Sequence, residues 1–567
     1  MNISRSAVPA KRWVSSSISS EAHELAEELG VPQLVGELLW QRGMHTIEEA
    51  GPFLDPRLQT LGDPFELTDM RAAGARIIAA LANQEQVVIF GDYDVDGLTS
   101  ITLLWRVLRA LGGNPGSFLP NRMTEGYGLS RGAIERCVQD FQPKLVVAVD
   151  CGTTSIAETV WLKEQGIDVV IIDHHELSSE LPHCHALVNP HRDGSYLYLC
   201  TVGLVFKLCH AILKLEPSWR NRIDLRHYLD LVAVGTVADI VPLREDNRVF
   251  VKNGLSVLEK TRNPGLKALC QISGIRGVPR PEDVGFRIGP RLNASGRLDD
   301  ATQSLRLLTT DDPEEAWQLA QNLDVQNRER QKLEQRIYDE ALDLLSQCFD
   351  HTQDWAIILG QRGWHAGVIG IVAARFQRLF YRPTIIIGFD ENGVGKGSGR
   401  SIAGCSLVEG LRKASNCLEK FGGHEMAAGL SLKESELTRF RELFHQYVKT
   451  VLSPDQLQPR LELARELEID QVGENLFNDL ERLAPFGREN PQPVFAFHHI
   501  RQQRAPQVIK KHLKLFLQGQ TDKCEAIGFG FAERPIPEDP LSLAGVVEWD
   551  DYSNRVHLRL VDWQTGS

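Results

Sequence analysis

Phe90-Gly91-Asp92-Tyr93-Asp94-Val95-Asp96-Gly97 is the stretch around which the chain is organised. It ends the apolar run 87–90, and a short apolar run that stops at a turn residue predicts a buried strand. Side chains of an extended segment alternate between two faces, so we expect the three aspartates of the stretch on one side. Clustered carboxylates repel one another unless a cation lies among them, and a hard divalent cation with oxygen ligands is the usual solution.

The same D-x-D-x-D-G spacing also opens an EF-hand calcium loop. That loop requires a glutamate at position twelve and a helix before it. Position twelve counted from Asp92 is Leu103, and the preceding residues predict a strand. The EF-hand is therefore disfavoured, whereas an acidic turn that is merely solvated stays open on this motif alone.

Length and composition indicate a globular protein of several domains. With 567 residues, 42% of them hydrophobic, the chain is too long for one core, and about three or four domains are expected. Its ten cysteines are scattered without a C-x-x-C pair, so neither a zinc ribbon nor a disulfide framework is indicated, and free thiols suit a reducing cytoplasm. The first 20 residues lack the apolar core of a secretory signal, and no transmembrane stretch is expected.

The formal net charge is −13. A protein that coats nucleic acid non-specifically is usually basic, so the charge argues against that class. It does not exclude a nuclease, because a metal site uses many acids and a local basic groove can coexist with an acidic exterior.

Two further apolar runs, 145–149 and 169–172, predict buried strands. Like the first run they do not alternate, which is typical of a parallel sheet covered on both faces. Ligands of open α/β sheets bind outside the carboxyl ends of the strands. The side chains expected at this edge are Asp94, Asp96, Asp150, Asp173, His174 and His175.

Asp239 lies in the otherwise apolar run 234–243. A buried carboxylate is costly unless it is paired or binds a metal, so Asp239 is a fourth contributor to the same site. The alternative is an aspartate that caps a helix or turn.

Two glycine-rich stretches carry arginines. Residues 289–297 predict a loop in which Arg291 and Arg297 face an anion, although solvated arginines are an equal alternative. In residues 395–401, exposed backbone N–H groups together with Lys396 and Arg400 would form an anion site, most plausibly for phosphate, unless the stretch is a mobile hairpin loop.

A long helix is predicted from Asp311-Asp312-Pro313 onward, with Asp as an N-cap candidate and Pro in the first turn. Its apolar periodicity continues for roughly 35 residues, or about 50 Å. Many charges lie between the apolar positions, so we interpret it as a spacer between two lobes.

After about residue 452 the sequence alternates in short segments separated by turns, which predicts a small antiparallel β barrel or sandwich. Basic and aromatic residues interleaved on such a module suit single-stranded nucleic acid, as in OB-folds, and an ordinary solvated sheet face is the alternative. The basic residues are Arg501, Arg504, Lys510, Lys511, Lys514 and Lys523.

The acidic motif 92–97, the strand ends at Asp150 and at Asp173-His174-His175, and the Asp239 segment resemble the four motifs of the DHH phosphoesterase superfamily. Gly422-Gly423-His424 resembles its companion DHHA1 domain, and residues 483–491 resemble the RecJ OB domain. The whole arrangement is similar to the RecJ family, bacterial single-strand-specific 5′→3′ DNA exonucleases.

The resemblance implies an α/β protein with a parallel-sheet DHH domain, a long connecting helix, a second α/β DHHA1 domain and a C-terminal β-barrel (OB-fold) domain. The expected ranges are 1–68 for a tail and helical preface, 69–310 for the DHH domain, 311–350 for the connecting helix, 351–452 for the DHHA1 domain and 453–567 for the OB-fold domain.

The resemblance also implies two Mn²⁺ or Mg²⁺ ions per active site. Their implied ligands are Asp92, Asp94, Asp96, Asp150, His174 and Asp239, with Asp150 as the bridge and Asp92 as a ligand or a supporting residue. His175 would contact the phosphate or the leaving group, and Asp173 would orient an imidazole. The implied DNA or phosphate contacts are Arg122, Arg291, Asn293, Arg297, Ser398, Arg400 and His424, of which Arg122, Ser398 and Arg400 would hold a 5′-phosphate.

The implied activity is hydrolysis of single-stranded DNA to mononucleotides in DNA repair and recombination. Single-strand-binding protein and a RecQ-type helicase are the partners that the family implies, with a cytoplasmic monomer and no membrane. Two alternatives stay open: another DHH phosphoesterase, such as an oligoribonuclease, and a non-catalytic scaffold that binds single strands.

Overall fold

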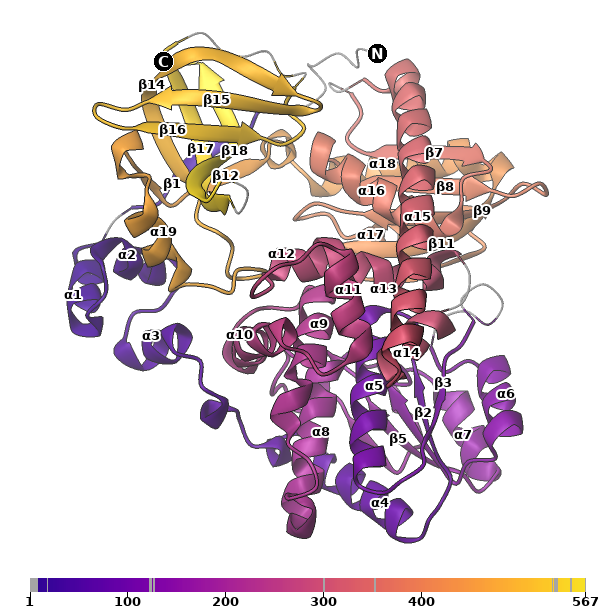
Figure 1. Cartoon of the computed structure of the whole chain (residues 1–567). Coiled ribbons are helices and arrows are strands. Elements are labelled where there is room, and N and C mark those ends of the chain that lie inside the picture. The colour runs from indigo at the N-terminus through magenta and orange to yellow at the C-terminus, as the bar shows by residue number, and fades with distance from the viewer. Residues whose placement is uncertain are drawn as a thin grey trace. The chain divides into compact units, whose positions relative to one another are not determined.

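The computed structural model describes residues 9–17, 19–121, 125, 128–298, 301–350, 353–532, 534, 539–550 and 553–565 (Figure 1). The chain forms two compact units. Unit 1 is Met1–Ser16 with Arg328–Arg465, and unit 2 is Ser17–Asn327 with Glu466–Ser567. The predicted domain boundaries stay predictions.

Unit 2 contains a five-stranded sheet in which every pairing is parallel, as predicted. In spatial order its strands are β3 (Gly116–Phe118), β2 (Val87–Gly91), β4 (Leu145–Val149), β5 (Asp168–Ile172) and β6 (Ala186–Val188). The three central strands are the apolar runs of the sequence, and the short outer strands β3 and β6 were not predicted.

Helices cover both faces of this sheet. Val87 and Ile89 of β2 pack into one cluster of buried apolar side chains, whereas Val88 and Phe90 pack into another on the opposite face. The helices of the first face include α4 (Met70–Ala82), α5 (Val95–Ala110) and α8 (Thr201–Leu215), and those of the second are α6 (Arg131–Phe141) and α7 (Ile156–Glu164) (Figure 1). Two-sided burial is the reason that the strands are apolar throughout.

The helical preface is confirmed by α1 (Ser20–Leu29), α2 (Gln33–Gln41) and α3 (Ile47–Leu54). The other long helices of unit 2 are α9 (Leu229–Ala238), α10 (Glu245–Glu259), α11 (Pro264–Ile272), α13 (Gly289–Leu298), α14 (Thr302–Thr309) and α19 (Glu474–Glu481). Among the described residues, no helix combines the length and apolar character needed to cross a bilayer.

The sequence suggested that the acidic motif is extended throughout, and the structure corrects this. Strand β2 ends at Gly91 and helix α5 begins at Val95, so Asp94 is the helix N-cap and Asp96 lies in the first turn. The Asp94 carboxylate accepts a hydrogen bond of 3.0 Å from the backbone N–H of Gly97. The aspartates therefore converge through a strand-to-helix turn and not through β alternation.

The prediction of a loop at residues 289–297 is wrong, because these residues form α13. Its glycines allow close packing: a Cβ at Gly289 would lie 3.6 Å from that of Ala238, and one at Gly296 would lie 3.2 Å from the Tyr93 carbonyl oxygen. Close approach of backbones explains glycine within a helix here, despite its low helix propensity.

The predicted long helix is confirmed as α15 (Pro313–Cys348), which has 36 residues. Asp312 caps its N-terminus, since its carboxylate accepts a hydrogen bond from the Glu314 N–H. Its first part belongs to unit 2 and its second part to unit 1.

Unit 1 contains a second five-stranded sheet. In spatial order its strands are β10 (Lys420–Gly423), β11 (Ala427–Lys433), β9 (Val394–Arg400), β8 (Thr384–Phe389) and β7 (Ile357–Arg362). All of its pairings are antiparallel except that between its first two strands in chain order, β7 and β8, which is parallel. The helices of this unit besides α15 are α16 (Ala366–Phe380), α17 (Leu407–Lys413) and α18 (Leu437–Val451).

The alternative of a mobile hairpin loop at residues 395–401 is wrong, as is the expectation of exposed backbone N–H groups, because most of these residues form β9 in the interior of the sheet. A Cβ at Gly395, Gly397 or Gly399 would lie 2.5–3.2 Å from a large side chain, those of Phe389, Leu430 and Leu407 respectively. The alternating glycines thus make room for bulky neighbours on one face and do not mark flexible backbone.

The N-terminal 20 residues were expected to be a loose tail, but Arg12–Ser15 form strand β1. It pairs in parallel with β12 (Arg460–Leu463) within unit 1. A four-residue strand at a chain terminus has too little periodicity to be predicted from sequence.

The C-terminal part of unit 2 is a closed five-stranded barrel. Its strands are β14 (Phe495–Ile509), β15 (His512–Gln518), β16 (Lys523–Gly528), β17 (Leu541–Asp550) and β18 (Arg555–Thr565). Pairing of β14 with β17 closes the ring. The predicted antiparallel arrangement holds except between β16 and β18, which are parallel.

The segment 483–491 leads into the barrel and is fastened to the rest of unit 2 by buried cations. Arg248 of α10 is 1% exposed and donates hydrogen bonds to the carbonyl oxygens of Phe53, Leu483, Ala484 and Pro485. Burial, together with the charge of nearby Arg42, lowers the pKa of Arg248 to about 9. The guanidinium also lies 3.5 Å from the centre of the Phe53 ring. A buried cation is tolerated here because its N–H groups are hydrogen-bonded.

Replacing Arg248 by Ala should lower the free energy of unfolding by about 3 kcal/mol, because it strands several buried carbonyl groups. The measurement is urea unfolding followed by far-UV circular dichroism. Arg244→Ala is the matched control, since the Arg244 side chain is 53% exposed. It should change the unfolding free energy by about 0.5 kcal/mol or less. Equal midpoints for the two variants would contradict the anchoring role of Arg248.

Candidate metal centre

Carboxylates from separate elements meet at the carboxyl edge of the parallel sheet. One ligand atom from each of Asp92, Asp94 and Asp150 lies within 4.8 Å of the other two. Asp92 is 0% exposed and Asp150 1% exposed. The strand ends that the sequence singled out are therefore neighbours in space, as the carboxyl ends of parallel strands must be.

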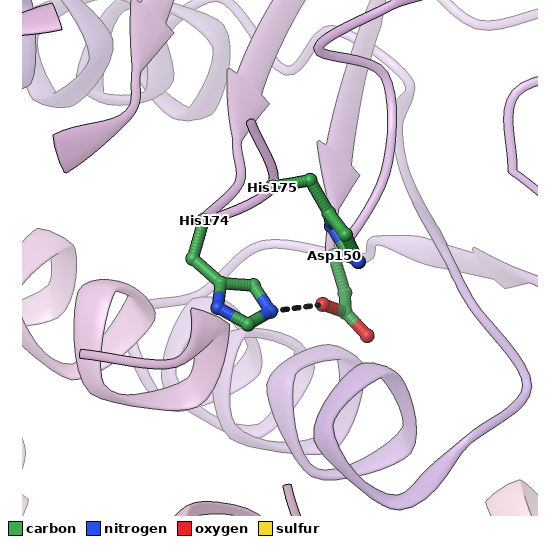
Figure 2. A group of neighbouring side chains, drawn as sticks. All are labelled: Asp150, His174 and His175. Atoms are coloured by element: carbon green, nitrogen blue, oxygen red, sulfur yellow. Dashed lines mark ion pairs between the residues drawn. The ribbon is translucent and has the colours of Figure 1, made fainter. Parts of the chain in front are cut away.

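His174 lies at the centre of a second group. Its Nε2 atom is 3.6 Å from an oxygen of Asp150, 3.7 Å from one of Asp239 and 3.9 Å from one of Asp96. Figure 2 shows the His174 ring facing the Asp150 carboxylate. These separations are too long for hydrogen bonds. They suit a shared ion, because two ligand atoms at about 2.1 Å from one cation lie about 3–4 Å apart.

The Asp96 carboxylate is held by the start of helix α8. The backbone N–H groups of Thr201 and Val202 donate hydrogen bonds of 2.7 and 2.8 Å to its two oxygens. The unpaired N–H groups and the dipole of a helix N-terminus favour negative charge. Helix α8 therefore fixes the position of one carboxylate.

Asp150 has a backbone φ of 62°, a left-handed conformation that turns its side chain from the end of β4 into the centre. Its Oδ1 accepts a hydrogen bond of 3.0 Å from the Thr201 hydroxyl. A strained backbone held in place at a ligand position is typical of functional sites.

Asp239 is the C-cap residue of α9. Sequence analysis had weighed a capping role as the alternative to a ligand role. A carboxylate is disfavoured at a helix C-terminus, where the dipole is negative. The cap position thus offers Asp239 no stabilisation, and a bound cation would.

Burial and mutual repulsion raise the pKa of these carboxyl groups. Burial and the charge of Asp94 raise the pKa of Asp96 to about 7, in spite of its hydrogen bonds to α8. Burial and neighbouring aspartates likewise raise the pKa of Asp150 and of Asp239 well above the usual range. A site that holds protons at neutral pH with oxygen ligands and one imidazole fits Mn²⁺ or Mg²⁺, which would displace those protons.

The two histidines differ in charge. Burial and the charge of His175 lower the pKa of His174 to about 4, so His174 is neutral, which is the form that binds metals. Burial alone would lower the pKa of His175, but its 2.7 Å hydrogen bond to Asp173 raises it to about 9. His175 is therefore a cation next to the carboxylates.

Asp173 organises this turn. Its carboxylate also accepts hydrogen bonds from the backbone N–H groups of His174 and Thr153. Burial by itself raises the pKa of Asp173, but the hydrogen bond from His175 and the positive charge of that ring outweigh it and lower the pKa below the usual range. Asp173 thus stays ionised and orients His175 by bonding its Nδ1 atom.

Sequence analysis missed three residues that complete the centre: Thr201, Asn189 and Cys200. Asn189 donates hydrogen bonds to the Thr153 hydroxyl and the His175 carbonyl oxygen. It directly follows β6, so its place after a strand was the signal that could have revealed it. The thiol of Cys200 groups with Asp96 and Asp239, and burial raises its pKa, so it stays protonated and is a poor ligand for a hard cation.

The predicted DNA contacts Arg291, Asn293 and Arg297 all lie on α13, the helix that packs against Tyr93 of the acidic motif. The Arg291 guanidinium donates to Asp324 at 2.8 and 3.0 Å and to the Arg287 carbonyl oxygen. It therefore already has an intramolecular partner, and DNA binding by these residues stays a prediction.

Ser398, Arg400 and His424 lie at one end of the sheet of unit 1. Arg400 donates a 3.2 Å hydrogen bond to the Ser398 hydroxyl, and Arg400 pairs in register with Ala427, three residues after His424. A Cβ at Gly370 would lie 2.9 Å from the Ser398 hydroxyl oxygen, so glycine at this position lets α16 pack closely against the pair. Their phosphate-binding role stays a prediction. Arg122 lies outside the described residues.

Three family matches divide the chain in the same order as the fold. The DHH family, N-terminal domain, matches residues 86–236, the DHHA1 domain matches residues 353–450, and the RecJ OB domain matches residues 464–561. The DHH match contains every implied metal ligand except Asp239.

Relatives match the chain over nearly its whole length. The single-stranded-DNA-specific exonuclease RecJ of Bacillus subtilis is 36% identical over 542 residues, which cover 94% of this chain and 67% of that protein. The RecJ of Dickeya dadantii is 36% identical over 516 residues, covering 87% of this chain and 88% of that protein. The chain belongs to the RecJ family.

The RecJ fold is confirmed by solved structures. RecJ of Thermus thermophilus in complex with Mn²⁺ aligns over 98% of this chain and 80% of its own, with a TM-score of 0.84 and 30% identity. The Mg²⁺ complex of RecJ from the same organism aligns over 98% of this chain and 79% of its own, with a TM-score of 0.78 and 28% identity. The α/β, α/β and barrel organisation expected from the sequence is thus the RecJ arrangement.

Asp150→Asn should raise the thermal midpoint of this RecJ-family chain without metal, because it removes one of several repelling buried carboxylates. It should also abolish stabilisation by Mn²⁺, which for the wild type reaches about 2.7 kcal/mol at one hundred times the dissociation constant. The measurement is thermal unfolding with EDTA and with Mn²⁺. Asp140→Asn removes an exposed carboxylate and is the control.

The same experiment has a pH dependence. The raised pKa values mean that protons compete with Mn²⁺, so its stabilising effect should shrink as the pH falls below about 7, the pKa of Asp96. If Asp150→Asn were still stabilised by Mn²⁺ to the same extent as the wild type, Asp150 would be excluded as a ligand.

Proposed function

We propose that this protein is a metal-dependent 5′→3′ exonuclease that hydrolyses single-stranded DNA to mononucleotides, in repair and recombination. The observation that carries the proposal is the buried group of carboxylates with a neutral His174 among them, because so many buried negative charges serve no structural purpose without cations. The relatives named above are single-stranded-DNA-specific exonucleases.

Mn²⁺ or Mg²⁺ is the cofactor, and two such ions supply Lewis-acid activation of the scissile phosphate and of a water molecule. Their proposed ligands are Asp92, Asp94, Asp96, Asp150, His174 and Asp239. Six proposed ligands are more than one ion usually takes from a protein. Asp150 belongs to both the group with Asp92 and Asp94 and the group with His174 and His175, so it is the proposed bridging ligand.

The protein groups that act directly on the substrate are proposed to be His175 and its partner Asp173. A protonated His175 can donate a hydrogen bond to a phosphate oxygen or to the leaving oxygen, while Asp173 keeps its ring oriented through Nδ1. Because the pKa of His175 is raised to about 9, this donor is available throughout the neutral range.

The activity and its polarity are tested with single-stranded DNA labelled at either end, incubated with the chain and Mn²⁺. Early release of the 5′ label as mononucleotide is expected, with a blunt duplex of the same sequence spared. EDTA should abolish release and Mn²⁺ should restore it. Early release of the 3′ label would refute the polarity, and attack on very short oligoribonucleotides alone would favour another DHH phosphoesterase. No cleavage under any condition would favour a scaffold.

Polarity requires a site that recognises the 5′ end, and Arg122, Ser398 and Arg400 are proposed to provide it. Burial lowers the pKa of Arg400, which remains a cation at any physiological pH. A guanidinium beside a hydroxyl can bind a phosphate group in a bidentate manner, which a lysine cannot reproduce.

Arg400→Ala should raise KM for 5′-phosphorylated strands about tenfold and leave KM for 5′-hydroxyl strands nearly unchanged, since only the former lose a charge-assisted contact. The measurement is steady-state hydrolysis of the two substrates. Arg412→Ala, which removes an exposed arginine paired with Glu409 in the same unit, is the matched control. Equal effects on both substrates would remove Arg400 from the end-recognition site.

The cellular setting is also a proposal. All ten cysteines lie in the described part of the chain and are free thiols, which supports a cytoplasmic location. One chain contains both the metal centre and the barrel, so a monomer suffices for the reaction. Single-strand-binding protein and a RecQ-type helicase are proposed partners through the family, and pull-down with each purified protein would test them.

A further inference from the structure

One arginine beside the metal centre has no role so far: Arg488, in the segment 483–491 that leads into the barrel. Its backbone is fixed at both sides. The Arg488 carbonyl oxygen accepts a hydrogen bond of 2.9 Å from the Leu243 N–H. The Gly487 and Asn490 backbones exchange hydrogen bonds of 2.9 and 3.2 Å, and Glu489 between them has a left-handed φ of 61°. This tight turn presents the Arg488 side chain in one place.

The turn places the guanidinium at the edge of the centre. Arg488 donates a 3.2 Å hydrogen bond from an Nη atom to the carbonyl oxygen of Ile240, the residue directly after Asp239. The cationic guanidinium is thus held one residue away from the Asp239 carboxylate.

Arg488 is not needed to attach the segment, because other arginines do so. Arg248 is saturated by buried carbonyl groups, and Arg42 donates to the Asn490 side chain and to the carbonyl oxygens of Leu38 and Pro491. Asn490 in turn donates to the carbonyl oxygens of Leu483 and Pro485. These contacts hold the segment without the Arg488 side chain.

The Arg488 side chain is, by contrast, exposed and largely unused. In the described part of the chain it makes the single hydrogen bond to Ile240 and no ion pair. The nearest acid in sequence, Glu489, faces Arg244 at 3.6 Å instead. A guanidinium has five N–H donors in a planar fork, so most of the Arg488 donors stay available to a ligand beside the metal centre.

We propose that Arg488 binds a backbone phosphate of the DNA strand at the Asp239 edge of the metal centre. The inference rests on the proposed nuclease function and adds a residue from the barrel side of unit 2 to the strand-binding surface. The bound phosphate is a neighbour of the scissile one, because the guanidinium is held one residue away from a metal ligand and not among the ligands.

A contact to a neighbouring phosphate is made equally in the ground state and in the transition state. Arg488→Ala should therefore raise KM about tenfold and leave kcat within about twofold of the wild type. It should also flatten the salt dependence: the slope of log(kcat/KM) against log[KCl] should become less negative by about 0.7, the contribution of one phosphate contact to a single strand.

The experiment compares the full-length wild type, Arg488→Ala, Arg488→Lys and Arg482→Ala on single-stranded DNA with Mn²⁺, at several KCl concentrations. Arg482 lies next to the same segment, is exposed and faces Asp479 at 3.9 Å, so its removal should change neither KM nor the salt slope. Arg488→Lys keeps the charge and should retain the wild-type slope with an intermediate KM. Thermal unfolding of each variant verifies that it is folded.

A neutral methylphosphonate, introduced at one linkage at a time near the 5′ end, then locates the contact. At one linkage it should raise KM for the wild type but not further for Arg488→Ala, because the two changes remove the same interaction. Additive effects at every linkage would overturn the proposal.

Two other outcomes are decisive. A wild-type KM and slope in Arg488→Ala, or a loss of kcat without a change in KM, would overturn this inference while leaving the nuclease function intact. If the wild-type chain itself released no nucleotide from single-stranded DNA, the proposed function would fail, and this inference would fail with it.

Discussion

Electrostatic repulsion among buried carboxylates is the constraint on which this structure depends. Asp92, Asp96 and Asp150 are almost completely shielded from water, and Asp94 and Asp239 lie beside them. Desolvation penalises each charge and proximity penalises the group, so the metal-free centre takes up protons. Bound divalent cations would relieve both the desolvation and the repulsion. The stability of this region and its chemistry therefore both depend on the same cluster of carboxylates.

The surrounding fold supplies partial compensation without neutralising the site. The N-terminus of α8 donates N–H groups to Asp96, the Thr201 hydroxyl donates to Asp150, and the pair of Asp173 and His175 places a cation at the border. The centre is therefore rigid enough to hold its shape and negative enough to require cations, a combination that preorganised metal sites share.

Much of the fold could be predicted because it follows from local periodicity. The apolar runs at β2, β4 and β5 predicted a parallel sheet, and the charged but regular stretch after Asp312 predicted the long helix α15. The errors occurred where tertiary packing overrides local preference. Glycines at 395, 397 and 399 suggested a loop, yet they form a strand because Phe389, Leu430 and Leu407 fill the space that their side chains would need.

The candidate site could also be predicted from local sequence patterns, but only as far as those patterns fix the ends of the strands. Chain order alone placed Asp150 and His174 at strand ends, and parallel strands bring their carboxyl ends to one edge, so the sequence by itself determined that these side chains lie together there. Only the tertiary structure decided that His174 is neutral and His175 charged, that α8 supports Asp96, and that Arg488 reaches the Asp239 edge from a segment about 250 residues away in the chain. The physical reason is that pKa values and long-range contacts depend on burial and on distances between elements, which local sequence patterns do not encode.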